Sequence, residues 1–152
     1  ESNVYSKDEV DGLVDNLQNQ MNVLNTNVEN LNSLINNTVS GKNYVNGTDF
    51  VINDSIFDAY QNVHIQKLGN HVFLYIQGAL KEYNQYSKYV VGTITNKELV
   101  PTRNYYLVGI MQSGANNIGQ AEVIIETSGE ISIRPLQNDC NWIFSDVDYL
   151  LK

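Results

Sequence analysis

The residues best suited to chemistry in this 152-residue chain are aromatic rings and amides rather than nucleophiles. Residues 83–89 combine three tyrosines with Asn, Gln, Ser and Lys, and residues 103–106 read Arg-Asn-Tyr-Tyr. Aromatic faces can pack on the CH groups of a sugar, while amides and Arg can hydrogen-bond its hydroxyls. The candidate saccharide-binding residues from composition alone are Tyr83, Tyr86, Arg103, Tyr105 and Trp142. The alternatives are a polar connector at 83–89, tyrosines at a subunit contact near 105, and a core anchor at Trp142.

The sequence contains no pattern that predicts a catalytic or metal-binding site. The chain has no Gly-Xaa-Ser-Xaa-Gly motif and no phosphate-binding loop. His64 and His71 fall on adjacent predicted strands, but no Cys or carboxylate cluster joins them as a metal site requires. The acids considered for glycoside hydrolysis are Asp146, Asp148, Glu122 and Glu126. Such enzymes hold two carboxylates across a cleft, whereas Glu122 and Glu126 share one strand face. We therefore expect no enzyme, no cofactor and no metal.

Composition excludes several classes of partner. Seventeen acidic against nine basic residues give a net charge of −8, so the chain lacks the basic footprint of a nucleic-acid binder. No segment approaches the ~20 apolar residues of a membrane span, so we expect no membrane insertion. Cys140 is the single cysteine, which excludes a disulfide within one chain. Because the sequence begins at Glu1, we expect it to be a fragment or a processed protein.

The first 41 residues predict one long helix with a coiled-coil seam. Ser6 and Glu9 have the spacing of a capping box, which opens a helix. Apolar residues then follow in alternating steps of four and three, the heptad pattern of a coiled coil. Val14, Met21, Val28 and Ile35 take the a positions, and Val10, Leu17, Leu24 and Leu31 take the d positions. Residues 1–41 are therefore predicted to form an oligomerising stem.

The heptad leaves the number of chains open. β-Branched residues at a with Leu at d favour a parallel dimer. Leu13 and Leu34 at g positions widen the apolar face, which suits a trimer. The alternative is a single amphipathic helix lying on the rest of the protein. That arrangement normally shows a broader apolar stripe with a period of 3.6 residues.

Beyond Gly41 the apolar period changes to two, which predicts a mainly β head. The expected strands are 49–52, 63–68, 71–80, 89–95, 105–112, 121–126, 130–134, 142–145 and 147–151. Gly69-Asn70 and Ser128-Gly129 fit tight hairpin turns between neighbouring strands. Short strands with frequent turns predict a β-sandwich or barrel. Residues 42–62 are predicted to be a linker and first strand, and residues 63–152 the head.

Phe73 and Tyr75 alternate with the core residues of the predicted strand 71–80, so they face away from the core. A strand buried on both faces, or ordinary exposed aromatics, would give the same pattern. Because a coiled coil upstream would hold copies of the head together, we expect Phe73 and Tyr75 to contact neighbouring subunits.

Residues 5–11 read Tyr-Ser-Lys-Asp-Glu-Val-Asp, and the head contains the segments 67–74, 99–103, 107–111, 121–133 and 142–144, with Tyr149. The head segments read as a strand–Gly-turn–strand unit, a Pro-Xaa-Arg element, a Ser-Gly hairpin and a closing Trp-containing strand. In this order and spacing they resemble receptor-binding and baseplate tail proteins of siphophages that infect low-GC Gram-positive bacteria. Residues 5–11 are similar to a motif that opens helical segments in such proteins. The resemblance covers residues 63–150.

The resemblance implies a homotrimer of jelly-roll-like heads that binds a host cell-wall saccharide. It places the protein in the virion, at the tail tip or baseplate, among other phage tail and baseplate proteins. It implies binding sites near the distal tip or between subunits, with receptor contacts on the strand matching 121–126. Glu122 is the nearest polar position there and completes the candidate list. The alternatives are a structural tail component that docks onto a phage protein, and an enzyme acting on wall glycans.

Overall fold

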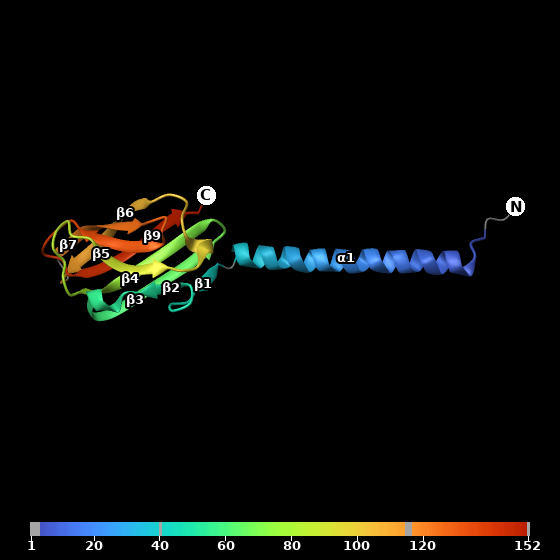
Figure 1. The fold of residues 1–152 in the computed structure, drawn as a ribbon, viewed down its shortest axis with the longest axis horizontal. Coiled ribbons are helices and arrows are strands. Elements are labelled where there is room, and N and C mark those ends of the chain that lie inside the picture. The colour runs from blue at the N-terminus through green and yellow to red at the C-terminus, as the bar shows by residue number, and fades with distance from the viewer. Residues whose placement is uncertain (1–3, 40, 115–116, 152) are drawn as a thin grey trace. The chain divides into compact units, whose positions relative to one another are not determined.

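The computed structural model describes residues 4–39, 41–114 and 117–151. The chain divides into two compact units, Glu1–Ser40 and Gly41–Lys152, each of which is described by itself. The first unit contains one helix, α1 (Lys7–Val39), and the second contains the β-strands (Figure 1). The prediction of a mainly β protein with an N-terminal helix is confirmed.

A capping box closes the N-terminal end of α1, as predicted. The Ser6 amide donates to Glu9 Oε2 at 2.7 Å, and the Glu9 amide donates to Ser6 Oγ at 3.2 Å. Two hydrogen bonds with Ser6 lower the pKa of the Glu9 carboxyl. The bond from the Ser6 amide has the larger effect, and the bond with the Ser6 hydroxyl has the smaller one. The 33 residues of α1 span about 50 Å at 1.5 Å per residue.

The predicted seam of α1 is uncovered in the single chain. All eight a and d side chains are exposed, from 43% for Val10 to 65% for Leu17. Leu13 and Leu34, which widen the seam, are exposed as well. The coiled coil and its number of chains stay predictions. Within the described part of the chain, no helix is long and apolar enough to cross a membrane.

The strands of the head form one sheet. Its strands are β1 (Lys42–Tyr44), β2 (Phe50–Ile52), β3 (Phe57–Leu68), β4 (His71–Leu80), β5 (Tyr89–Ile94), β6 (Tyr105–Ser113), β7 (Asn117–Ile125), β8 (Glu130–Pro135) and β9 (Trp142–Leu150). Short 3-10 helices lie at η1 (Asp54–Ile56) and η2 (Lys97–Leu99). The spatial order is β1-β3-β4-β9-β6-β7-β8-β5-β2, and all the strand pairs are antiparallel.

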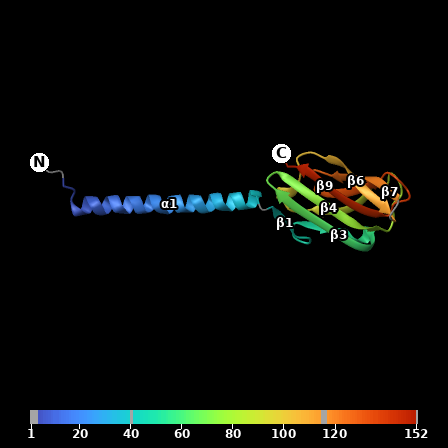
Figure 2. The same ribbon diagram turned by 180° about the vertical axis from the view of Figure 1, so that it is seen from behind.

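The sheet curls until it is nearly closed, like a barrel (Figures 1 and 2). Its two edge strands, β1 and β2, are consecutive in the chain and are joined by residues 45–49. In that turn the Gly47 amide donates to the Phe50 carbonyl at 2.7 Å. The predicted jelly-roll connectivity stays a prediction.

Alternation along the strands produces the core. In β4, Val72, Leu74 and Ile76 point inward and are almost fully buried, while the residues between them face outward. In β9 the buried Tyr149 donates its hydroxyl hydrogen bond to the Leu99 carbonyl at 2.7 Å. This burial raises the pKa of the Tyr149 phenol.

The side chain of Ser145 on β9 links β9 to β6 by hydrogen bonds. Their backbone pairing is in register only at Met111–Ile143 and Gln112–Trp142. Next to these pairs, the Ile110 amide donates to Ser145 Oγ at 2.9 Å, and that hydroxyl donates to the Ile110 carbonyl. Gly109 leaves the space for it, because a Cβ at this position would overlap Ser145 Oγ.

The structure changes several predicted boundaries. Residues 42–62 contain β1, β2 and the start of β3, so this range packs as part of the head instead of separating it from α1. β3 begins already at Phe57, where two register shifts in its pairing with β4 interrupt the alternation that predicts a strand. The two runs expected at 142–145 and 147–151 are one strand, β9.

Candidate functional site

The loop containing Tyr83 and Tyr86 is tied to the connection between β8 and β9. The Gln85 amide donates to Asn138 Oδ1 at 2.8 Å, and the Tyr86 amide donates to the Pro135 carbonyl at 2.8 Å. Tyr83 packs against the core, whereas the Tyr86 ring is exposed. Of these two candidates, the ring that a ligand can reach is that of Tyr86.

Arg103 and Tyr105 lie at the other end of the strands. The Arg103 guanidinium lies 4.8 Å from the centroid of the Tyr105 ring, and the Tyr105 hydroxyl donates to the Leu150 carbonyl at 2.7 Å. Leu150 pairs with His71, the first residue of β4, whereas Tyr83 lies just beyond Leu80, the last residue of β4. Ten residues of strand span about 33 Å, so these candidates do not form one site.

The half-buried Trp142 lies at the Tyr83 end of the strands. It opens β9, where it pairs with Ala79 on one side and Gln112 on the other. It is therefore also remote from Arg103 and Tyr105.

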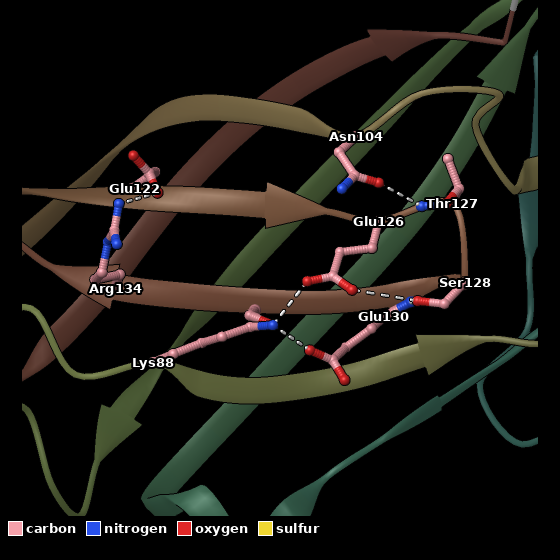
Figure 3. Close-up of polar contacts among 9 residues, drawn as sticks. Lys88, Asn104, Glu122, Glu126, Thr127, Ser128, Glu130 and Arg134 are labelled. Atoms are coloured by element: carbon pink, nitrogen blue, oxygen red, sulfur yellow. Dashed lines mark hydrogen bonds and ion pairs between the residues drawn. The ribbon is translucent and has the colours of Figure 1, made fainter.

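Glu122 belongs to a set of ion pairs on the outer face of β7, β8 and β5 (Figure 3). Arg134 Nη2 lies 2.6 Å from Glu122 Oε1 on the neighbouring strand. Lys88 Nζ lies 2.7 Å from both Glu126 Oε1 and Glu130 Oε1. These two hydrogen bonds raise the pKa of Lys88, and Lys88 is the first cause of the lowered pKa of Glu130. Each acid is already paired with a base, so this face offers no carboxylate free to bind a ligand.

A different group of outward-facing residues surrounds a shallow hollow of about 360 Å³, here called the β3–β4 hollow. It is lined by Asn43 of β1, His64 and Gln66 of β3, Phe73 and Tyr75 of β4, and Asp146 of β9. The strands β3, β4 and β9 run side by side at this face (Figure 2). The register places these residues together, because Asn43 pairs with Gln66, His64 with Tyr75, and Tyr75 with Asp146.

The Tyr75 ring is held in place by its neighbours. It stacks on the His64 ring, with centroids 6.2 Å apart and planes at 27°, and meets the edge of Phe144 at 5.8 Å. Its hydroxyl donates to Gln77 Oε1 at 2.9 Å. The next outward position along β4 is Phe73, whose side chain is 37% exposed. Tyr75 is therefore a fixed aromatic surface beside a second ring.

Three polar side chains of the β3–β4 hollow lack a bonding partner in the part of the chain that the structure describes, in contrast to the ion-paired side chains of Figure 3. Among the described residues, the side chains of Asn43, Gln66 and Asp146 have no hydrogen-bond or ion-pair partner. The hollow thus combines aromatic faces with an unpaired amide pair and a carboxylate. Across the described ranges, no group of three or more His, Cys, Asp and Glu residues could hold a metal ion.

Sequence reasoning placed Phe73 and Tyr75 on the outward face of β4, as the structure does; their role in subunit contact stays a prediction. It missed Gln66, which lies opposite Phe73 across a hairpin, and Asn43 and Asp146, which reach the hollow only through the pairing of β1 with β3 and of β9 with β4. The available signal was the hairpin at Gly69-Asn70, whose register predicts that His64 and Gln66 lie opposite Tyr75 and Phe73.

An apolar surface lies on the outward face of β6. Its three consecutive outward residues, Tyr106, Val108 and Ile110, are 63%, 69% and 51% exposed, and we call them the β6 stripe. Ile118 of β7 and Phe144 of β9 are exposed apolar residues on the adjoining strands. Exposed apolar side chains gathered in this way are typical of a protein contact.

The sequence matches no family model and no curated protein. The structure is similar to the head domain of lactococcal phage bIL170, a receptor-binding domain, with a TM-score of 0.51 and 14% sequence identity. That similarity covers 69% of this chain and 96% of the phage domain. This chain contains the fold of a phage receptor-binding head domain.

A second similarity extends over nearly the whole chain. The receptor-binding protein gp15 of Listeria phage PSA is 16% identical, and the match covers 99% of each chain. Its TM-score is 0.49.

Proposed function

We propose that this chain is a receptor-binding protein at the tail tip or baseplate of a siphophage that infects low-GC Gram-positive bacteria. Its jelly-roll-like head binds a host cell-wall saccharide, and α1 joins three chains into a homotrimer. The observation that carries the proposal is the fold shared with the lactococcal head domain. The proposed role is binding without hydrolysis.

Two surface features support binding of a neutral saccharide. The outer face of β3, β4 and β9 combines exposed aromatic rings with free amides and a carboxylate, groups that suit sugar CH faces and hydroxyls. The net charge of −8 disfavours an anionic polymer, because the repulsion would grow with each added chain.

The homotrimer is supported by α1 and by the β6 stripe. The eight seam residues of α1 are exposed in one chain, and burying them against identical helices stabilises the assembly by the hydrophobic effect. Chains joined at α1 hold their heads at high local concentration. The β6 stripe then provides an apolar surface through which neighbouring heads make contact.

A second candidate function is a structural one, in which the head docks onto another tail or baseplate protein. The observation that favours it is the β6 stripe, since three exposed apolar residues in a row suit a protein partner as well as a second head. In this case saccharide would not bind.

Binding of the fluorescently labelled full chain to purified walls of low-GC Gram-positive bacteria tests the proposal. We expect binding to intact walls of a subset of strains, and loss of binding once the wall polysaccharide is stripped. The walls should release no reducing sugar during incubation. A chain that binds none of the walls, or binds stripped walls as well as intact ones, would contradict the saccharide-receptor proposal.

A further inference from the structure

We propose that the β3–β4 hollow is a saccharide subsite that takes one neutral hexose or N-acetylhexosamine unit. This inference rests on the proposed function and assigns its ligand to particular residues. A volume of about 360 Å³ is near the lower end of ligand pockets, which span roughly 300–1,000 Å³, and this suits one sugar unit rather than a long segment of polymer.

The Tyr75 ring of the hollow is held by three contacts that need no ligand. Tyr75 is fixed by the stack with His64, the edge contact with Phe144 and the hydrogen bond to Gln77. A ring held in its binding orientation loses little conformational entropy on binding. Tyr75 is half-buried and Phe73 is 37% exposed, so both rings retain surface on which the apolar face of a pyranose can pack.

The polar part of the hollow comes from three strands that surround these rings. Asn43 and Gln66 supply amide donors and acceptors, and Asp146 supplies acceptors, the groups that hydroxyls require. Within the described chain none of these side chains is engaged elsewhere, unlike Glu122 and Glu126, which are paired with bases. The hollow is thus the place where aromatic surface and free polar groups coincide.

The charge of the hollow selects against anionic ligands. Asp146 lies on its wall, and Asp148, whose Oδ2 lies 3.4 Å from His71 Nδ1, is the next outward residue of β9. No Lys or Arg lines the hollow among the described residues. A phosphate or uronate would meet a carboxylate without a compensating cation, so the neutral sugar is favoured.

This assignment gives Phe73 and Tyr75 to the ligand rather than to the subunit contact predicted from the sequence. Contact between heads is then left to the β6 stripe, on the far side of β9 from β4. The two surfaces can be separated by substitution, because they share no residue.

Saturation-transfer NMR titrations of the full chain with the methyl glycosides of glucose, galactose and N-acetylglucosamine test the inference. At least one of these probes should bind the wild type. Tyr75→Ala should weaken that binding by about tenfold or more, as should Asp146→Asn, a near-isosteric change with little effect on folding. Tyr86→Ala is the matched control, an exposed tyrosine outside the hollow, and should bind as the wild type. The methyl glycoside of glucuronic acid should bind more weakly than that of glucose.

The inference is overturned if none of the three neutral probes binds, or if Asp146→Asn and Tyr75→Ala both bind as the wild type. Loss of binding in Tyr86→Ala alone would move the site to the loop after β4. A lower sedimenting mass for Tyr75→Ala would make the hollow a subunit contact instead. If Tyr75→Ala still binds host walls as the wild type does, the hollow is wrong while the receptor-binding proposal stands. Failure of the wild type on every wall contradicts that proposal itself.

Discussion

Replacing Leu24 by aspartate tests whether α1 joins copies of this chain. Leu24 is a d residue near the middle of the seam and is 60% exposed in the single chain. Full burial of a Leu side chain contributes roughly 1.5–3 kcal/mol, so covering the exposed part contributes about 1–2 kcal/mol per chain. Over three chains the lost layer amounts to about 3–6 kcal/mol, a weakening of association by about 10²- to 10⁴-fold. Three carboxylates brought together in the seam add repulsion to this loss.

The assay is sedimentation velocity of the full chain over a range of concentrations. We expect the wild type to sediment with three times the mass of one chain and Leu24→Asp to dissociate as it is diluted. Val23→Asp is the matched control, because Val23 is 62% exposed on the same turn but lies outside the seam. Retention of the wild-type mass by Leu24→Asp, or equal dissociation of both variants, would show that the heptad register is wrong. A wild type that sediments as a dimer would correct the number of chains alone.

The remaining predictions concern the head. Lys88→Ala should lower the free energy of unfolding by about 1 kcal/mol at pH 7, since partly exposed ion pairs are weak. The pKa of Glu130 is lowered, so its ion pair with Lys88 stabilises the fold only while the carboxylate is charged. Urea titrations should therefore show the difference between wild type and variant fading as the pH falls below about 4.5. A difference that stays constant with pH would contradict the ion pair. Gly109→Ala should destabilise by about 1–3 kcal/mol through overlap with Ser145 Oγ, and an unchanged melting temperature would contradict that close approach. Val108→Asp should leave the melting temperature of the head unchanged and slow the sedimentation of the oligomer as its heads separate; an unchanged sedimentation coefficient would exclude the β6 stripe as the contact.

The elements governed by local pattern could be predicted from the sequence. The capping box of Ser6 and Glu9 gives the start of α1, because both of its hydrogen bonds join residues three apart. The bounds of β4 match the predicted range 71–80, since its alternation is uninterrupted and Gly69 supplies the positive φ that the turn requires. In contrast, β1 was missed because residues 43–49 are rich in turn-forming types, and only its pairing with β3 makes it a strand.

The candidate site was less predictable than the elements that build it. Phe73 and Tyr75 could be recognised as outward-facing from alternation within one strand. Their neighbour Asp146 joins them from a strand about 70 residues later, through the antiparallel register of β4 and β9. Glu122 is a contrasting case, because the register of the predicted hairpin at Ser128-Gly129 already places it opposite Arg134, the base with which it pairs.

The edges of the sheet matter for a protein that is proposed to assemble in several copies. Its two edge strands have three residues each, and the part of β3 that β1 leaves unpaired, residues 57–64, is interrupted by two register shifts, a feature that hinders strand pairing. Heads tethered through their helices would meet at about millimolar effective concentration, where a long open edge would recruit strands from its neighbours. Because these edges are short or interrupted, a neighbouring head finds no long regular strand to pair with in the described part of the chain, and contact between heads of the proposed trimer falls to side chains.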